Sequence, residues 1–293
     1  MNVAIYGRKV STKQDINDVS ELIRCIQKEG WAPILEQNLK KELYKKTRLF
    51  GDLDTFSSFH DFSSGIDLAI SLGGDGTFIK TVSYIRDSGV PILGINTGRL
   101  GFLANIGREQ MEQAFEAVRN GSHKIQYRSL LQLETEKRLF GEHNFAINEL
   151  TVQRKNTASM VTVHAHLNGD FLNSYWADGL IVATSAGSTA YNLSCGGPII
   201  TPGSRVHILT PIAAHNLNVR PMIVPDNLPI TLKVEGRDKH NLVSLDSKTM
   251  SVANGEELLI KKADFRINVV QFEYNTFFET IRNKLLWGID KRN

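Results

Sequence analysis

The sequence has few of the features that define several large protein classes. Its 293 residues include two cysteines, Cys25 and Cys195, with no Cys-x-x-Cys pair. This excludes a disulfide-stapled scaffold and favours reduced cysteines that bind no metal. Lys and Arg number 34 against 31 Asp and Glu, so no charge excess indicates a nucleic-acid or membrane-surface partner. No apolar run approaches the roughly 18 residues of a spanning helix, and residues 1–7 are too short and strand-like for a secretion signal. We therefore expect a cytoplasmic protein that binds small molecules.

The sequence also lacks the two commonest phosphate-binding loops. Residues 73–77 are Gly-Gly-Asp-Gly-Thr, without the third glycine of the dinucleotide fingerprint and without the Gly-Lys-Ser/Thr of the P-loop. They nevertheless follow an apolar, strand-like run at residues 66–72 and precede a helical pattern. In such a strand–turn–helix unit, the N–H groups of a glycine-rich turn can face a phosphate.

The carboxylate within this turn, Asp75, is its unusual residue. At about 4 Å from a phosphate oxygen, a carboxylate is repelled by roughly 4 kcal/mol at an effective dielectric near 20. Asp75 is therefore expected to meet the phosphates through a cation, or to face a hydroxyl proton, as phosphoryl transfer requires. The alternative is that Asp75 caps the following helix and has no chemical role.

The hydrophobic pattern predicts two domains. Strand-like runs occur at residues 3–7, 31–35, 66–72 and 90–96, with helical spacing between them. This alternation predicts an α/β domain with a mostly parallel sheet. Residues 38–64 are predicted to be a solvated helix and a variable loop. After a helix at residues 109–120, short β-branched segments predict antiparallel strands. We predict an α/β phosphate- and nucleotide-binding domain over residues 1–107, joined by a returning helix in residues 275–293. Residues 108–274 are predicted to form a β-rich, antiparallel domain.

Three further stretches are rich in small and polar residues where a strand ends. They are residues 96–103, the pair Asn148-Glu149, and residues 178–194. Each alone is equally compatible with an ordinary turn or helix cap. Together they suggest a ligand, since Asn beside a carboxylate can bind the two hydroxyls of a ribose. The Gly-Ser-Thr turn at residues 187–189 offers N–H and hydroxyl groups to a second polar end of a long ligand.

These stretches, taken in order, resemble the NAD kinase family. The similarity is carried by residues 73–77, 96–102, 148–149, 178–191 and 210–221, and by the closing residues 282–288. Diacylglycerol and sphingosine kinases share the Gly-Gly-Asp-Gly-Thr turn, but the combination with Asn-Glu and Gly-Ser-Thr-Ala-Tyr is more specific. The resemblance implies transfer of the terminal phosphoryl group of ATP, or of polyphosphate in some members, to the 2′-hydroxyl of the adenosine ribose of NAD.

The resemblance also implies roles for individual residues. Asp75 is the expected catalytic carboxylate, close to Mg²⁺ or another divalent metal held by the phosphates of ATP. The expected NAD-binding residues are Gly74, Gly76, Thr77, Phe102, Asn148, Glu149, Asp178, Ser188, Thr189, Ala190 and Tyr191. The β-rich domain over residues 108–274 is expected to bind NAD and to form the contacts of a homodimer or homotetramer. Where relatives have Pro-Thr and Pro-His-Ser, this chain has Ser185-Ala186 and Ala214-His215-Asn216, which bears on the tightness of the site more than on the reaction.

The chemistry of the acceptor defines what Asp75 is expected to do. A ribose hydroxyl is a far weaker acid than an ordinary aspartic acid, whose pKa is about 3.9. Early removal of its proton is therefore unfavourable, and a loose transition state does not require it. We expect Asp75 to orient the hydroxyl, accept its proton late and help to place Mg²⁺. Two alternatives remain: a lipid or sphingoid kinase, which has no use for Asn148-Glu149, and a non-catalytic NAD-binding regulator.

Overall fold

The computed structural model describes residues 1–63, 65–156 and 160–288. The chain divides into two compact units. The first unit contains Met1–Tyr127 together with the described residues from Ile267 onward, and the second contains Arg128–Arg266. Each unit has its own hydrophobic core.

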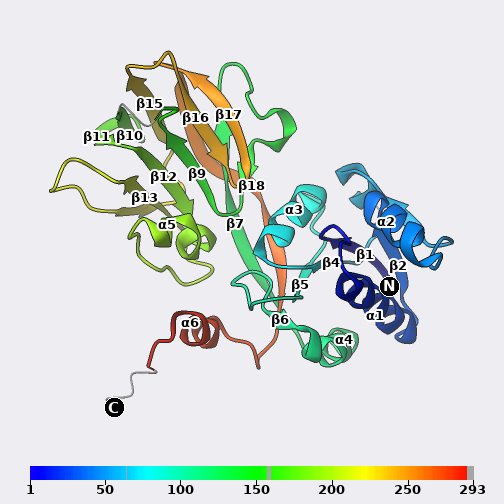
Figure 1. The fold of residues 1–293 in the computed structure, drawn as a ribbon. Helices are drawn as coiled ribbons and strands as arrows, with labels where there is room; N and C mark the ends of the chain where they lie inside the picture. The colour runs from blue at the N-terminus through cyan, green and yellow to red at the C-terminus, as the bar shows by residue number, and fades with distance from the viewer. Residues whose placement is uncertain (64, 157–159, 289–293) are drawn as a thin grey trace. The chain divides into compact units, whose positions relative to one another are not determined.

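The first unit is built on a parallel sheet (Figure 1). Its strands run in the order β5-β4-β1-β2-β3, and all of these pairs are parallel. The bounds are β1 Asn2–Gly7, β2 Ala32–Glu36, β3 Asp54–Phe56, β4 Leu68–Leu72, β5 Ile92–Asn96 and, pairing with β5, β6 Ile106–Gly107. The predicted mostly parallel sheet is confirmed. The prediction of a variable loop is wrong at β3, where residues Asp54–Phe56 form a strand. The sequence did not reveal this strand because it has three residues, of which only Phe56 is buried, and so shows no periodicity.

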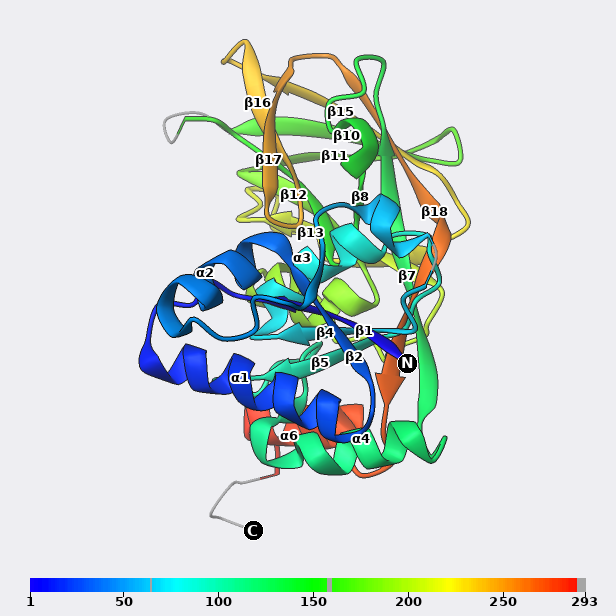
Figure 2. The same ribbon diagram turned by 90° about the vertical axis from the view of Figure 1, so that its right-hand side faces the viewer.

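Helices pack on both sides of this sheet. Figure 2 shows α3 on one side of the strands and α1 and α4 on the other. The bounds are α1 Lys13–Lys28, α2 Gln37–Thr47, α3 Asp75–Ile85, α4 Met111–Arg119 and α6 Phe277–Leu285, with short 3-10 turns η1 Phe59–Phe62 and η2 Arg108–Gln110. A capping box between Thr12 and Asp15 begins α1, which buries Leu22 and Ile26 completely. Its apolar residues recur every three to four positions, which is why the sequence predicts this helix well.

The closing helix, α6, belongs to the first unit, as predicted. Thr276 caps its N-terminus through the N–H of Glu279, and Ile281 is 4% exposed. Just before the helix, the Asn275 side chain donates to the carbonyl of Asn105. A helix with one apolar face must bury it against another element, and here the first unit provides that element.

The second unit is antiparallel throughout its described pairs. One sheet has the order β14-β13-β12-β9-β16-β17, and β11, β10, β15 and the beginning of β18 pair in turn. The bounds are β7 Lys124–Glu134, β8 Phe145–Ala146, β9 Glu149–Gln153, β10 Val161–Leu167, β11 Asp170–Ala177, β12 Gly179–Thr184, β13 Val206–Ile212, β14 Met222–Pro225, β15 Ile230–Gly236, β16 His240–Leu245, β17 Lys248–Ala253, β18 Glu257–Gln271, α5 Tyr191–Ser194 and the 3-10 turns η3 Gly141–His143 and η4 Ala186–Thr189. The predicted β-rich, antiparallel domain is confirmed.

The units change over at Tyr127 and Ile267, whereas the change in sequence pattern lies near residue 107. The helix α4 explains the difference, because Phe115 is buried against Trp31 of the first unit, with ring centroids 5.7 Å apart. Two predicted strands, residues 258–260 and 265–272, form the single strand β18. The division of functions between the two domains stays a prediction.

No helix in the described part of the chain is long and apolar enough to cross a membrane.

Candidate active site

The glycine-rich turn joins β4 to α3, as its sequence predicts. Gly74 is the N-cap residue and Asp75 is the first residue of α3. The N–H groups of Thr77 and Phe78 donate to the Gly74 carbonyl at 2.9 and 3.1 Å. The N–H groups before them lack an acceptor within the helix, as at every helix N-terminus. This end of α3 therefore suits an anion such as phosphate.

The Asp75 carboxylate does not cap this helix, which has no side-chain cap. It turns instead to the loop after β5. Oδ2 accepts the N–H of Phe102 at 2.9 Å, and Oδ1 accepts those of Leu103 at 2.9 Å and Ala104 at 3.0 Å. Each carboxylate oxygen can accept about two hydrogen bonds. Oδ1 is therefore fully used, and Oδ2 keeps one lone pair for a ligand.

The loop that binds Asp75, residues 97–104, needs glycine at position 101. A Cβ at Gly101 would lie 2.0 Å from Oδ1 of Asp75, so any side chain there displaces the carboxylate. The N–H of Gly101 donates to the Ala104 carbonyl at 3.0 Å. Asn96 bridges the loop, since its side chain donates to Ala104 O at 3.2 Å and accepts the Gly98 N–H at 2.7 Å.

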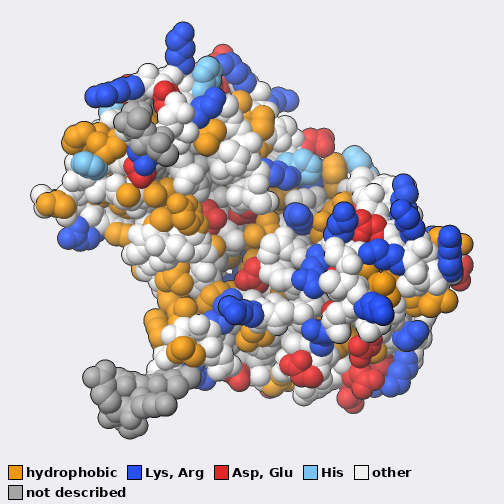
Figure 3. Space-filling model, viewed as in Figure 1, with side chains coloured by type: hydrophobic (Ala, Val, Ile, Leu, Met, Phe, Trp, Pro, Cys, Tyr) orange, Lys and Arg blue, Asp and Glu red, His pale blue; other side chains and the backbone are white. Residues whose placement is uncertain are grey.

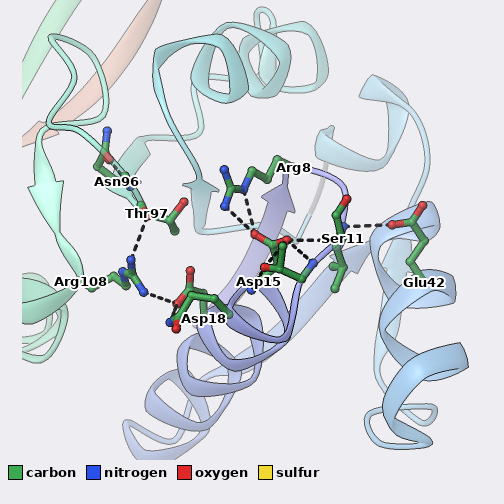
Figure 4. A network of polar contacts seen from close by, with 12 residues as sticks. Arg8, Ser11, Asp15, Asp18, Glu42, Asn96, Thr97 and Arg108 are labelled. Carbon is green, nitrogen blue, oxygen red and sulfur yellow. Dashed lines mark hydrogen bonds and ion pairs between the residues drawn. The ribbon is translucent and has the colours of Figure 1, made fainter.

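A network of charged side chains holds the start of this loop (Figure 4). Arg108 donates to the Thr97 carbonyl at 3.0 Å and to Asp18 of α1 at 2.7 Å. Nearby, Arg8 forms an ion pair with buried Asp15 at 2.6 Å. Burial raises the pKa of Asp15, but N–H donors from Thr12 and Ser11 and the side chains of Thr12 and Arg8 outweigh it, so this pKa lies well below its usual range. None of these contacts was predicted from the sequence, although the Thr12-x-x-Asp15 spacing is a local signal for a capping box.

In the second unit, a carboxylate that no motif indicated positions Asn148-Glu149. Asp246 lies in the turn between β16 and β17. It accepts the N–H of Ile147 at 3.0 Å, that of Asn148 at 2.9 Å and that of Glu149 at 3.2 Å. Asp246 thus fixes the backbone at Asn148-Glu149, whereas at the other group the backbone of the 97–104 loop fixes the carboxylate of Asp75. A hairpin turn was foreseeable there, but its partners 97 to 99 positions away were not.

Glu149 is a buried carboxyl, 9% exposed. Burial, with the Asp246 charge next, raises the pKa of Glu149 to about 8, against a lowering effect of the Tyr191 N–H. Burial also raises the pKa of Asp246 to about 6. A carboxyl group with such a pKa exists in both forms near neutrality. It can therefore donate as well as accept a hydrogen bond, which suits a hydroxyl-bearing ligand.

The Gly-Ser-Thr turn packs directly on Asn148. A Cβ at Gly187 would lie 2.1 Å from the Asn148 carbonyl oxygen. The turn also closes without the proline that relatives have, because Thr184 Oγ1 accepts the Gly187 N–H at 3.1 Å and donates to Ile147 O at 2.5 Å. Ser188 is fully buried, and its hydroxyl donates to Ser185 O at 2.7 Å and accepts the Ile200 N–H at 3.0 Å. The Ser188 hydroxyl therefore joins the turn to the backbone of Ile200.

The remaining predicted ligands lie at the edge of this group. Tyr191 is 39% exposed, and its hydroxyl accepts from Gln153 at 3.2 Å. Asp178 forms an ion pair with Arg154 at 2.9 Å. Thr189 and Ala190 are partly exposed between these residues in sequence.

The structure thus brings the predicted residues together as two groups. Gly74, Asp75, Gly76, Thr77 and Phe102 belong to the first unit, and the residues from Asn148 to Tyr191 belong to the second. Their joint action on one ribose stays a prediction. Among the described residues, no group of three or more His, Cys, Asp or Glu side chains is arranged to hold a metal ion.

The family comparison matches both units. The family model for the ATP-NAD kinase N-terminal domain matches residues 9–123, and that for the ATP-NAD kinase C-terminal domain matches residues 147–272. The chain belongs to the NAD kinase family. This membership confirms the resemblance inferred from the motifs, and the predicted enzyme class, a kinase, with it.

Full-length relatives agree. The chain is 47% identical over 297 residues to an NAD kinase of Flavobacterium johnsoniae, covering 100% of both chains. It is 39% identical over 292 residues to an NAD kinase of Bacteroides fragilis, again covering 100% of both. The fold is that of yeast NADH kinase complexed with NADH, with a TM-score of 0.86, 23% identity and 99% and 89% of the two chains covered. An NAD kinase from Archaeoglobus fulgidus in complex with ATP gives a TM-score of 0.72 at 23% identity, with 97% of each chain covered.

Proposed function

We propose that this NAD kinase family member transfers the terminal phosphoryl group of ATP to the 2′-hydroxyl of the adenosine ribose of NAD, with Asp75 as the catalytic carboxylate. The observation that carries this assignment is the arrangement of three N–H donors around Asp75. They fix the carboxylate and leave one lone pair of Oδ2 for an incoming group. A helix cap or a solvated surface residue has no need of such an arrangement.

In the proposed reaction, the bond between the ribose oxygen and the γ-phosphorus forms while the bond from that phosphorus to the β-bridging oxygen breaks. ADP leaves with the electron pair of the broken bond. The free lone pair of Asp75 Oδ2 accepts a hydrogen bond from the hydroxyl, orients its oxygen and takes the proton late. Early deprotonation is not required in a loose transition state. Phosphate oxygens bind the free N–H groups at the beginning of α3, at Gly74 and Gly76, and Thr77 borders them with its hydroxyl.

The residues predicted to bind NAD from Asn148 to Tyr191 belong to the second unit. We assign binding of the NAD adenosine to Asn148 and Glu149, whose backbone is fixed by Asp246. The part of NAD beyond the adenosine is assigned to four further residues, Asp178, Thr189, Ala190 and Tyr191. Ser188 supports the turn, since its buried hydroxyl is bonded to the backbone of Ser185 and Ile200. Phe102 offers a partly exposed ring beside Asp75. Solved structures of the same fold in complex with NADH and with ATP support this assignment of substrates.

The residues around Asp75 fit a metal that arrives with the nucleotide. Mg²⁺ commonly keeps water and phosphate ligands and takes only one or two carboxylates, and Asp75 is the carboxylate at hand. Mg²⁺ would neutralise charge on the transferred phosphoryl group. Direct ligation of Mg²⁺ and acceptance of the hydroxyl proton compete for the same Oδ2 lone pair. We therefore propose that Asp75 faces the hydroxyl, and that the phosphates of ATP would hold the metal.

We also propose that the protein works in the cytoplasm as a homodimer or homotetramer. Hydrophobic side chains gather on the surface of the second unit near β11 (Figure 3). Phe171 and Trp176 of β11 are 62% and 48% exposed, and Ile223 of β14 is 47% exposed. Exposed apolar patches of this kind mark association surfaces. Size-exclusion chromatography with light scattering tests the oligomer directly, and a monomer at micromolar concentration would contradict it.

A coupled assay tests the reaction. The protein is incubated with NAD, Mg²⁺ and, separately, ATP or polyphosphate, and the product is detected with an NADP-specific dehydrogenase. We expect NADP with ATP. If neither donor gives NADP, the assignment is contradicted, and the alternative of a non-catalytic NAD-binding regulator is favoured instead. The family membership leaves no support for a lipid or sphingoid kinase.

A further inference from the structure

The donors that hold Asp75 come from one short backbone segment, residues 102–104. Their positions fix the direction of the free Oδ2 lone pair. A displacement of about 1 Å at a reacting group can cost about a hundredfold in rate. Whatever holds this segment in place therefore matters to the reaction.

The helix α6 contacts this segment at Phe102, and the chain just before the helix contacts the residue that follows the segment. The ammonium of Lys284 lies over the Phe102 ring, 4.5 Å from its centroid. The ring of Phe277 lies 6.5 Å from that of Phe102. Beyond the segment, the Asn275 side chain donates to the carbonyl of Asn105. These contacts join residues 170 or more positions apart, all within the first unit.

We propose that Lys284 is a positioning residue for phosphoryl transfer. Its ammonium is attracted to the face of the Phe102 ring and thereby holds the Phe102 N–H against Oδ2 of Asp75. The proposal rests on the proposed role of Asp75. It assigns the C-terminal helix a function beyond burying its apolar face. Lys284 acts through Phe102 and does not touch the substrate.

The charge of Lys284 is what the contact requires, so the variants separate charge from bulk. Lys284→Met keeps the length and loses the ammonium, while Lys284→Arg keeps a cation that also stacks on aromatic rings. Arg282→Met is the matched control, because Arg282 is an exposed cation on the same helix. We expect Lys284→Met to lower kcat about threefold to tenfold, with KM for NAD and ATP within about twofold of wild type. Lys284→Arg should retain most of kcat, and Arg282→Met all of it.

Amide hydrogen exchange provides a measurement that does not depend on turnover. We expect faster exchange at residues 102–104 in Lys284→Met, but not in Arg282→Met, at equal melting temperature. Unchanged exchange in Lys284→Met overturns the proposal, whether or not the wild type makes NADP. A raised KM for ATP at unchanged kcat also overturns it, since that result indicates direct contact with substrate. If the wild type makes no NADP, the proposed function fails, and the exchange data still decide whether Lys284 holds the segment.

Discussion

The backbone N–H of Phe102 donates to Oδ2 of Asp75 at 2.9 Å, across 27 positions of sequence. This bond joins the end of β5 to the beginning of α3 at the carboxyl edge of a parallel sheet, where such folds bind ligands. Together with the bonds from Leu103 and Ala104 it prevents the carboxylate from rotating. The catalytic assignment of Asp75 depends on this fixed orientation.

Asp75→Asn should lower kcat for NADP formation by at least about a hundredfold. The amide has one acceptor oxygen where the carboxylate has two, so its NH₂ group must face either an N–H donor of the 97–104 loop or the substrate hydroxyl. Neither arrangement leaves a group that can take the proton. The coupled NADP assay measures the effect. Asp87→Asn, an exposed position shortly after α3, should retain wild-type turnover. Turnover by Asp75→Asn close to wild type would refute the catalytic role.

Gly101→Ala tests the position of the carboxylate without removing it. The added Cβ would lie 2.0 Å from Asp75 Oδ1, so the loop or the carboxylate must move. We expect kcat to fall about tenfold to a hundredfold, with a smaller change in KM. The matched control is Gly98→Ala, whose Cβ would meet only Asn96 Oδ1 at 3.9 Å, an ordinary contact. Equal kcat values for the two alanine variants would contradict this account of the site.

Local patterns predicted much of the fold, and with the family resemblance they indicated the candidate residues of both groups, but not how those residues are held. The apolar run at residues 66–72 and its glycine turn indicated a parallel strand, a helix and a phosphate site, and β4 and α3 lie there. The pairing of Asp75 with Phe102, and that of Asp246 with Asn148, could not be predicted in this way. Hydrogen bonds between residues 27 or 98 positions apart leave no period in a sequence. The strand β3 was missed for the opposite reason, because it is too short to show a period.

Asp246→Asn should weaken NAD binding although Asp246 is not proposed to touch NAD. The carboxylate accepts three N–H groups around Asn148, and an amide leaves at least one of them unpaired. A buried unpaired donor costs about 1–3 kcal/mol, so the Asn148 backbone should shift. We expect KM for NAD to rise about tenfold, with a smaller change in KM for ATP. Asp264→Asn, at an exposed position of β18, is the control. An equal rise in both KM values would argue for general destabilisation instead.

The buried Glu149 makes the stability of the fold depend on pH. Because its pKa is raised, this group's contribution to stability falls as the pH rises. Its pKa is about 8 in the folded chain against an ordinary 4.5. Between these values the folded state holds a proton that the unfolded state has released. The free energy of unfolding contributed by this group therefore falls as the pH rises through that window. The contribution is fully present only below the lower value.

Glu149→Gln removes this titration while keeping nearly the same shape. Relative to wild type, the variant should gain stability steadily from about pH 5 to about pH 8. Over this range only the wild type has a carboxyl group that must either stay protonated on folding or place a buried charge beside Asp246, and the free-energy cost of staying protonated increases as the pH rises. Urea unfolding at several pH values in this window gives the difference in unfolding free energy. Glu136→Gln, an exposed neutralisation in the same unit, should give a difference that stays nearly constant with pH. If the Glu149→Gln difference is equally flat, the carboxyl titrates normally, and a neutral Glu149 cannot be the hydrogen-bond donor that the ribose site is proposed to use.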